Sequence, residues 1–562
     1  MGIGSILLER GLISDEELSR AISEQKQTGE RLDEVLVRLE FVSRSEVLEA
    51  IGQQFSMPIV DLTQVEVKDD VLSQLPSKLV FKQRCVPIGR YNGTLRIATS
   101  DPYELSAFDE LRLLTGLGIE LVLADERDLE KFIRTHYGVA GDTLDALTGE
   151  QTAQARGRDD DGFGSDAAID EVEQAQEASV IKLVNELLLE AIRERATDVH
   201  IEPYEDRLDV RYRIDGVLQQ AGVPATINRF RNAVISRLKI MANLNIAEKR
   251  TPQDGRITFR NRGDEFDLRV SVIPMLFGEG VVLRILNKQA ALIDLNSLGM
   301  DNDLLSLWDA LIARPHGIVL VTGPTGSGKS TTLYASLNRI VSDAVKAITV
   351  EDPVEYHVEG VNQIQVNHKV GLSFAAGLRA ILRHDPDIVM IGEIRDRETA
   401  DAAIQASLTG HLVFSTLHTN DAAGAMTRLL DMGVEPFLVA SSVEGVMAQR
   451  LVRRVCESCA VDLEPEEVDL PADFTMTEHD QLRVGRGCRE CRHSGYHGRI
   501  GIYELLTMTP EVRELVMQQR NAGLIAERAR ETNQLTLLRD AGFAKVRQGA
   551  TTLAEVIRVT KA

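Results

Sequence analysis

The segment from residue 317 to residue 341 places the strongest constraint on how this chain can fold. The apolar run Gly317–Thr322 predicts a buried strand, Gly323–Thr331 has the sequence GPTGSGKST, and Leu333–Val341 has helical spacing. A strand, a GxxxxGK[ST] loop and a helix in this order form a phosphate-binding loop, in which glycines let backbone amides point at phosphate oxygens. The chain is therefore predicted to be an α/β protein that binds a nucleoside triphosphate with Mg²⁺.

Each residue of this loop is a candidate for nucleotide binding. Lys329 would meet the β- and γ-phosphate oxygens, and Ser330 would hold Mg²⁺. The full predicted set is Gly323, Pro324, Thr325, Gly326, Ser327, Gly328, Lys329, Ser330 and Thr331.

Two further predicted strands end in acidic residues. The run 348–350 is followed by Glu351, and the run 387–392 is followed by Glu393. Because ligands of parallel α/β sheets lie beyond the carboxyl ends of the strands, we expect both glutamates beside the phosphates. One carboxylate can hold the Mg²⁺ shell and the other can orient the attacking water. Two neighbouring acidic residues can be simple helix caps, namely Asp352 and Asp396.

A histidine stands at each end of a fourth predicted strand within Thr409–Thr419. His411 and His418 are seven residues apart. At ~3.3 Å per residue this separates the imidazoles by about 23 Å, and the odd offset places them on opposite faces. They cannot share one phosphate within a subunit, so we predict His418 as the γ-phosphate sensor and assign His411 to packing or to a neighbouring subunit.

Four of the five cysteines form two close pairs separated by 28 residues: Cys456, Cys459, Cys488 and Cys491. A Cys₄ set suits tetrahedral Zn²⁺ with no open coordination position. The zinc is therefore predicted to be structural, in a small excursion over residues 451–495. The fifth cysteine, Cys85, is predicted to be a buried thiol at the start of a strand.

The first sixty residues contain an internal repeat. Ile3 and Ser14, among others, recur 29 residues later as Leu32 and Ser43, and each serine can cap a helix. Two helical hairpins are therefore expected, followed by a small α/β unit, in an N-terminal domain of residues 1–138. Gly, Asp, Gln and Ser dominate residues 139–178, which are predicted to be a flexible linker.

Residues 179–295 predict a second α/β domain with an arginine-lined face. Alternation in the segments 207–217 and 266–272 directs arginines away from the core. P-loop enzymes often borrow a cation for the transition state, and the phosphate loop itself contains no arginine. We therefore predict that Arg213, Arg269 and Arg284 take part in catalysis across a domain or subunit boundary, although surface solubility is the alternative role for such arginines.

Charge and hydropathy exclude other classes of protein. Lys and Arg total 63 against 86 Asp and Glu, a formal net charge of −23, which disfavours a nucleic-acid translocase and predicts no nucleic-acid partner. The sequence has no apolar stretch of the ~18 residues that a membrane span needs, and its N-terminus is unlike a signal peptide, so a cytoplasmic location is expected. A nucleotide-gated signalling or scaffold protein remains an alternative.

Together these motifs resemble the secretion ATPase superfamily, and most closely its type II secretion system ATPases. Type IV pilus assembly (extension) ATPases are close relatives and the alternative assignment, but 405–410 and 432–437 are more similar to the secretion branch. The resemblance rests on the four cysteines and on Ala196–Pro203, Gly323–Thr331, Thr349–Pro353, Ile391–Asp396, Thr409–Asn420 and Gly498–Glu504.

The resemblance implies a RecA-like P-loop ATPase domain at 296–450, preceded by a PAS-like domain at 179–295 and followed by the zinc excursion and a C-terminal helical region at 496–562. It further implies a homo-hexameric ATPase that uses ATP and Mg²⁺. Such a motor lies beneath an inner-membrane platform protein, is attached peripherally through cytoplasmic docking proteins, and drives assembly of a pilin-like fibre for protein export.

Some members of this superfamily bind cyclic di-GMP through a two-copy N-terminal domain. Here Gly2 stands where the first copy of that pattern has Arg, and Asp33 and Glu40 replace the glycines of the second copy, which does keep Arg31. These departures argue against dinucleotide binding.

Overall fold

The computed structural model describes residues 3–28, 30–103, 111–113, 115–138, 140, 143–144, 147, 178–261, 263–287, 294–464, 470–477, 480–488, 490–532 and 535–560. They form two compact units. The first comprises Met1–Thr258 and Leu268–Ile285, and the second Phe259–Asp267 and Leu286–Ala562. Helices and sheets alternate in both, which confirms the predicted α/β class.

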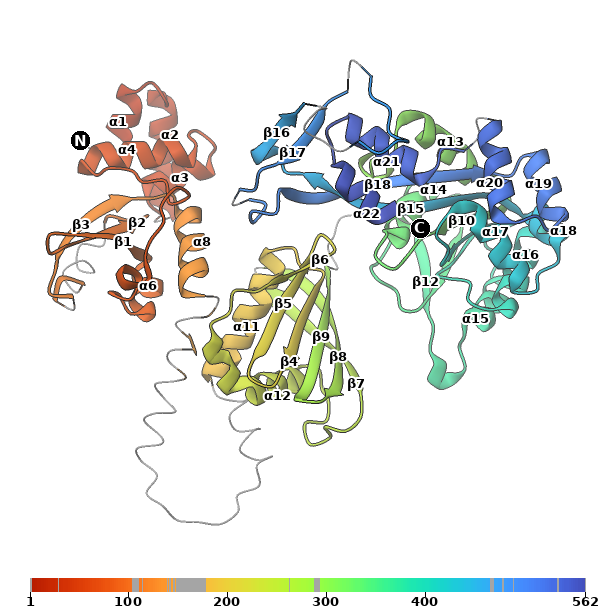
Figure 1. The fold of residues 1–562 in the computed structure, drawn as a ribbon, viewed down its shortest axis with the longest axis horizontal. Helices are drawn as coiled ribbons and strands as arrows, with labels where there is room; N and C mark the ends of the chain where they lie inside the picture. Colours follow the sequence, from red (N-terminus) through yellow and green to blue (C-terminus); the bar gives the residue numbers. More distant parts are fainter. Residues whose placement is uncertain are drawn as a thin grey trace, which may run out of the picture. The chain divides into compact units, whose positions relative to one another are not determined.

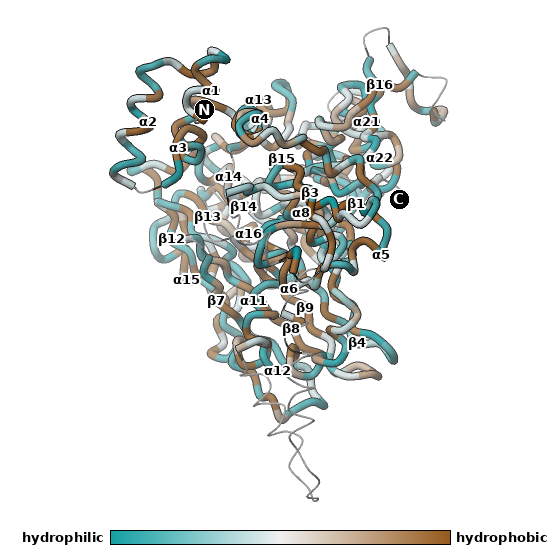
Figure 2. The backbone as a smooth tube through the Cα atoms, turned by 90° about the vertical axis from the view of Figure 1, so that its left-hand side faces the viewer, coloured by the Kyte–Doolittle hydropathy of each residue, from teal (hydrophilic) through white to brown (hydrophobic). Residues whose placement is uncertain are grey.

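Two helical hairpins open the first unit: α1 (Ile3–Glu9) with α2 (Asp15–Thr28), and α3 (Leu32–Arg38) with α4 (Arg44–Phe55). The predicted caps are confirmed, because the Oγ atoms of Ser14 and Ser43 each accept a hydrogen bond of 3.3 Å from the amide three residues on. Figure 2 shows α2 as mostly hydrophilic. The hairpins are held together by a shared apolar core in which Leu7 and Leu36 are fully buried.

A small α/β unit follows the hairpins. It contains α5 (Asp69–Leu72), α6 (Ser77–Gln83), β1 (Cys85–Tyr91), β2 (Thr94–Thr99), β3 (Gly118–Leu123) and α8 (Glu126–Tyr137). The strands form one sheet in the order β1-β2-β3. Cys85 is fully buried at the start of β1, as predicted.

The rest of the first unit is built on most of a six-stranded sheet in the order β6-β5-β4-β9-β8-β7, of which residues 259–267 are grouped with the second unit. Its elements are α11 (Ala178–Arg193), β4 (Asp198–Pro203), β5 (Leu208–Ile214), β6 (Val217–Gln220), η1 (Ala225–Phe230), α12 (Arg231–Met241), β7 (Gln253–Asn261), β8 (Asp264–Met275) and β9 (Gly278–Asn287). Leu208, Val210 and Tyr212 are buried on one face of β5, which confirms the predicted alternation.

The prediction that a flexible linker begins at residue 139 is wrong for the residues that the structure describes there. Ala140, Thr143, Leu144 and Leu147 are buried. Thr143 Oγ1 also donates a 2.9 Å hydrogen bond to a carboxylate of α11, that of Glu186. The apolar side chains in this stretch bury themselves against the fold, although the surrounding composition is polar. The predicted linker residues 148–177 lie outside the described part of the chain.

The second unit is organised around a seven-stranded sheet in the order β12-β11-β13-β14-β10-β15-β18. Neighbouring strands from β12 to β15 are parallel. The strands are β10 (Gly317–Thr322), β11 (Ala347–Glu351), β12 (Val361–Gln365), β13 (Ile388–Ile391), β14 (Leu412–Leu417), β15 (Val443–Val455) and β18 (Tyr496–Thr507).

Helices cover both faces of this sheet (Figure 1). The helical elements of this part of the chain are η2 (Leu295–Ser297), α13 (Asn302–Ile312), α14 (Lys329–Ile340), η3 (His368–Val370), α15 (Phe374–Ile381), α16 (Arg397–Leu408), α17 (Ala422–Asp431) and α18 (Pro436–Ser442), of which η3 has no buried residue. Side chains of β10 alternate between two cores, with Ile318 and Leu320 in one and Val319 and Val321 in the other. Burial on both faces explains why this strand is a continuous apolar run.

Two predicted boundaries in the second unit are wrong. The ATPase domain does not end at residue 450, because β15 continues to Val455 within the main sheet. The region 496–562 is not helical throughout, because it opens with β18, which pairs antiparallel with β15. Between these two strands lie η4 (Glu457–Cys459), β16 (Ala460–Leu463) and β17 (Leu482–Gly485). Helices follow as α19 (Pro510–Met517), α20 (Ala522–Glu531), α21 (Leu538–Arg547) and α22 (Leu553–Thr560).

Candidate nucleotide site and cysteine cluster

The carboxyl ends of the central parallel strands surround a cavity of about 440 Å³. Its lining includes the phosphate loop that follows β10, together with Glu351, Glu393 and His418, which come from the ends of three other strands. The predicted convergence of these groups is therefore present in the fold. From the loop itself, Thr325, Gly326, Gly328, Lys329, Ser330 and Thr331 line the cavity.

The loop backbone has the conformation that its glycines were expected to allow. The φ angles of Gly323, Gly326 and Gly328 are +147°, +79° and +88°. A Cβ atom on Gly323 would lie 2.5 Å from the backbone oxygen of Gln449 on β15, so the loop is packed directly against that strand. Helix α14 begins at Lys329, which places its amino end at the loop.

Lys329 extends across this loop. Its Nζ atom donates hydrogen bonds of 2.9 and 3.0 Å to the backbone oxygens of Gly323 and Pro324. Burial lowers the pKa of this ammonium group. Ser327 Oγ is buried without a hydrogen-bond partner among the described residues. A lysine and an unsatisfied hydroxyl at the amino end of a helix fit a phosphate ligand, so the loop residues suit ATP with Mg²⁺.

Glu351 is a buried carboxylate surrounded by neutral donors. Its Oε1 atom accepts hydrogen bonds from Thr349 Oγ1 at 2.5 Å and Gln363 Nε2 at 3.1 Å, and its Oε2 atom accepts one from the hydroxyl of Tyr334. Burial raises the pKa of Glu351, and these hydrogen bonds oppose that rise. Three neutral side chains thus hold the carboxylate in position.

Glu393 is in a different environment. Its Oε1 atom lies 2.5 Å from Arg395 Nη2, and its Oε2 atom lies 3.3 Å from His418 Nε2. The hydrogen bond to Glu393 raises the pKa of Arg395. This strand-end carboxylate is therefore linked to a cation and to the histidine that we predicted as a phosphate sensor.

The remaining predicted residues of this region have structural contacts. Asp396 caps α16 through a 2.8 Å hydrogen bond from the Thr399 amide, as expected of a helix cap. Asp352 lines the cavity and lies 3.4 Å from His368 Nε2. His411 Nδ1 is 2.8 Å from the backbone oxygen of Ala406 at the end of α16, which agrees with the packing role proposed for it.

The predicted catalytic arginines lie in the first unit, whereas the cavity is lined by residues of the second. Arg213 and Arg284 both approach Asp198, with N to O distances of 3.6 and 3.2 Å. Sequence reasoning missed two arginines that do line the cavity, Arg395 and Arg499. Arg395 could have been found from its position two residues after Glu393, but nothing local in the sequence indicates that Arg499 returns to the phosphate loop on β18.

The four paired cysteines form one cluster. The Sγ atoms of Cys456 and Cys488 are 3.7 Å apart, as are those of Cys459 and Cys491, and all four lie within 4.8 Å of one another. Four thiolates arranged tetrahedrally at about 2.3 Å from Zn²⁺ would lie about 3.8 Å from each other. The donor set and its dimensions therefore fit zinc.

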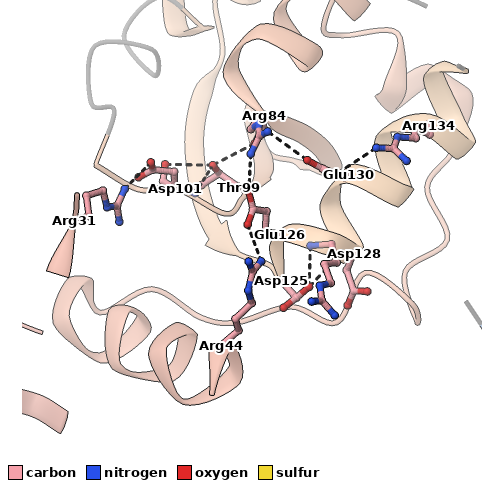
Figure 3. Close-up of polar contacts among 11 residues, drawn as sticks. Arg31, Arg44, Arg84, Thr99, Asp101, Asp125, Glu126, Asp128, Glu130 and Arg134 are labelled. Carbon is pink, nitrogen blue, oxygen red and sulfur yellow. Dashed lines mark hydrogen bonds and ion pairs between the residues drawn. The ribbon is translucent and has the colours of Figure 1, made fainter. Parts of the chain in front are cut away.

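A second cavity, of about 540 Å³, lies in the N-terminal part of the chain between α3, α4 and the small sheet. Arg31 forms an ion pair with Asp33 at 2.6 Å. Figure 3 shows its second pair, with Asp101 at 2.7 Å, and shows Glu126 bridging Arg44 and Arg84 at 3.1 and 2.6 Å. The charged lining consists of four arginines and five acidic residues: Arg31, Arg38, Arg44, Arg84, Asp33, Glu34, Asp101, Asp125 and Glu126. An excess of acidic groups does not favour an anionic ligand.

The fold and the cavity define a P-loop ATPase whose phosphate loop, strand-end carboxylates and histidine converge on one site. Residues 173–558 match the family described as Type II/IV secretion system protein, and residues 55–143 match the MshEN domain. The chain belongs to the Type II/IV secretion system protein family and is an ATPase. ATP and Mg²⁺ are accordingly its nucleotide and metal.

Curated relatives match almost the whole chain. The type II secretion system protein E of Xanthomonas campestris is 43% identical over 564 residues, covering 99% of this chain and 97% of the relative. The type IV pilus assembly ATPase PilB of Myxococcus xanthus is 42% identical over 565 residues, covering 99% and 98%. Among solved structures, the Legionella pneumophila ATPase DotB has a TM-score of 0.51 at 22% identity, covering 67% of this chain and 95% of DotB, which shows a shared fold.

Proposed function

We propose that this chain is the ATP-hydrolysing motor of a type II secretion system, which drives assembly of a pilin-like fibre and protein export. The observation that carries the proposal is the convergence of Lys329, Glu351, Glu393 and His418 on one cavity in a chain of this family. The motor region supports the secretion branch, because the type II secretion system protein E of Pseudomonas aeruginosa is 52% identical over 393 residues, covering 70% of this chain and 78% of the relative.

A type IV pilus assembly motor is the second candidate. It is favoured by the near-complete match to the Myxococcus xanthus pilus ATPase, whose overall identity of 42% is close to the 43% of the Xanthomonas secretion relative. Both candidates require the same hydrolysis chemistry, so they differ in the fibre that the motor serves.

The contacts of the two glutamates support different roles for them. Glu351 is held by three neutral donors, and burial raises the pKa of its carboxyl group, which suits a group that orients and deprotonates the attacking water. Glu393, which is tied to Arg395 and His418, suits a role in the Mg²⁺ shell beside the hydroxyl of Ser330. Bound Mg²⁺ would neutralise charge on the phosphates, and Lys329 would bind their oxygens. His418, which lies beside Glu393, would contact the γ-phosphate and so link it to that carboxylate.

The cysteine cluster is proposed to hold one structural Zn²⁺ through Cys456, Cys459, Cys488 and Cys491. With four thiolate ligands the metal has no open position for water, so its contribution is to stabilise the segment between β15 and β18.

Assembly and location follow from the same proposal. We expect a homo-hexamer in the cytoplasm, attached peripherally to an inner-membrane platform protein through docking proteins, with no nucleic-acid partner. No helix among the described residues is long and apolar enough to cross a membrane. In such a ring Arg213, Arg269 or Arg284 would complete a site of a neighbouring subunit, so hydrolysis would depend on assembly.

Two experiments test this proposal. Purified protein should hydrolyse ATP only with Mg²⁺, and Glu393→Gln should lower turnover by ~10²–10³, a typical loss when a group that stabilises transition-state charge is removed. Near wild-type turnover in that variant would contradict the assigned site. In the source organism, deletion of the gene should abolish export of extracellular proteins and leave surface pili intact, whereas the opposite phenotype would establish the pilus alternative.

The acidic excess of the N-terminal cavity and the pairing of Arg31 with two carboxylates oppose the binding of cyclic di-GMP there. Calorimetric titration of the full chain with cyclic di-GMP is expected to show no saturable binding. Asp33→Gly, which removes one partner of Arg31, is the variant in which binding would increase if charge neutralisation is the reason.

A further inference from the structure

Tyr334 is placed where it can control one of the two strand-end carboxylates. It lies on α14, five residues after Lys329, is 1% exposed, and lines the nucleotide cavity. Its hydroxyl donates a hydrogen bond to Glu351 Oε2. The same helix therefore carries the phosphate-binding lysine in its first turn and, one turn later, a tyrosine that donates a hydrogen bond to Glu351.

The acceptor positions of Glu351 show what this hydrogen bond does. An ionised carboxylate offers about four acceptor positions. Thr349 and Gln363 occupy Oε1, and Tyr334 is the single protein donor recorded for Oε2 among the described residues. The remaining acceptor position is therefore on Oε2, the oxygen whose orientation Tyr334 fixes, and Glu351 lines the cavity in which a water would be held.

Tyr334 is itself held in place from two directions. The amide of Glu355 donates a 3.4 Å hydrogen bond to its hydroxyl, and the ring of Tyr356 packs edge-on against its ring with centroids 4.5 Å apart. A phenol with both its ring and its hydroxyl fixed presents its proton to Glu351 in one direction. Such constraint is what a group needs in order to orient another side chain.

We infer that Tyr334 is a positioning residue for ATP hydrolysis, which acts by holding Glu351 Oε2 toward the attacking water. This inference rests on the proposed role of Glu351. The hydrogen bond also favours the ionised carboxylate, because the hydroxyl can only donate to it. The groups that act on Glu351 are Tyr334 on α14, Gln363 on β12, Thr349 on its own strand, and the like charge of Glu355 in the turn that follows.

The test is a double-mutant cycle in the full-length protein, with ATP hydrolysis followed under single-turnover conditions. Tyr334→Phe should lower the rate about tenfold, equivalent to about 1.4 kcal/mol, with little change in ATP affinity. The acid limb of its pH profile should move to higher pH, because loss of the donor raises the pKa of Glu351. In a Glu351→Gln background, adding Tyr334→Phe should change the rate less than twofold.

A matched control is Tyr503→Phe, which removes a buried hydrogen bond of 2.9 Å from the hydroxyl to the backbone oxygen of Leu298. Tyr503 is not part of the cavity lining, so this variant should keep the wild-type rate and pH profile. If Tyr334→Phe is poorly folded by melting temperature, Thr349→Val removes another donor from the same carboxylate and should shift the acid limb in the same direction.

Two results would overturn the inference. Equal losses from Tyr334→Phe in the wild-type and Glu351→Gln backgrounds would show a role that does not pass through Glu351. Wild-type rate and pH profile in Tyr334→Phe would show no role at all. Failure of the proposed role of Glu351 is distinguishable from both, because Glu351→Gln alone would then remain active.

Discussion

The close packing of the phosphate loop on β15 leads to a quantitative prediction about Gly323. A Cβ atom at this position would lie 2.5 Å from the backbone oxygen of Gln449 and 2.7 Å from Ser327 Oγ, and the φ angle of +147° is one that L side chains rarely adopt. The backbone oxygen belongs to β15, which is paired with β10 on one side and β18 on the other and is therefore held in place. The change Gly323→Ala must therefore displace the loop.

The magnitude follows from these two effects. Backbone strain in a glycine-only region costs of order 1–3 kcal/mol, and overpacking typically adds 1–3 kcal/mol. If the loop escapes by moving away from β15, the amides that face the phosphates move with it. We expect the dissociation constant for ATP to rise at least about 30-fold, which corresponds to the lower sum of about 2 kcal/mol.

Gly326 provides the matched control. Its φ angle is +79°, but a Cβ atom at this position would meet no other described atom within 4 Å, so Gly326→Ala introduces conformational strain without a clash. That strain is about 1–2 kcal/mol, which predicts a smaller loss of affinity. Titration of both variants with a fluorescent ATP analogue measures the difference. If Gly323→Ala binds as tightly as Gly326→Ala, the argument from packing against β15 is refuted.

Four further predictions concern other parts of the chain. Lys329→Ala should abolish turnover, as measured by phosphate release, because no other described lysine lines the cavity. Cys456→Ser should lower the zinc content, measured by elemental analysis as about one per chain in the wild type, and expose 456–495 to protease while ATP still binds. Glu40 has a φ of +58°, a left-handed conformation that is unfavourable for residues other than glycine. Glu40→Gly should therefore stabilise the N-terminal domain by about 1 kcal/mol, seen in calorimetry as a higher melting temperature. Burial raises the pKa of Glu555, but hydrogen bonds from Arg558 and Arg453 lower it from 4.5 to about 2, so Glu555→Gln should cost about 2–3 kcal/mol at pH 7. Hydrogen exchange of α22 at pH 7 and acid unfolding both measure this difference in stability between the wild type and the variant. The difference should vanish as the pH falls from about 4.5 toward 2.

Local features of the sequence were sufficient to predict the phosphate loop and the cysteine cluster. The loop is a contiguous strand, turn and helix, and its glycines are needed at φ angles that other residues avoid, so its conformation is encoded within a short contiguous segment. The helix caps at Ser14 and Ser43 were predictable for the same reason, since each cap and its partner are three residues apart. The convergence of Glu351 and Glu393 followed from a general rule about parallel sheets.

Only the tertiary structure decided which distant side chains complete the site. Tyr334 meets Glu351 because α14 packs on the sheet, against β10 and β14, and its tyrosine reaches the carboxylate at the end of β11. Arg499 lines the cavity because β18 returns to the main sheet more than a hundred residues after β13. The predicted end of the ATPase domain at residue 450 was wrong for the same reason, because the cysteine excursion is an insertion between β15 and β18, two strands that pair with each other. Strand pairing is set by long-range packing and loop closure, whereas sequence patterns reflect the local preferences of short segments. The reactive residues of the site could therefore be predicted from the sequence, but the distant residues that surround them could not.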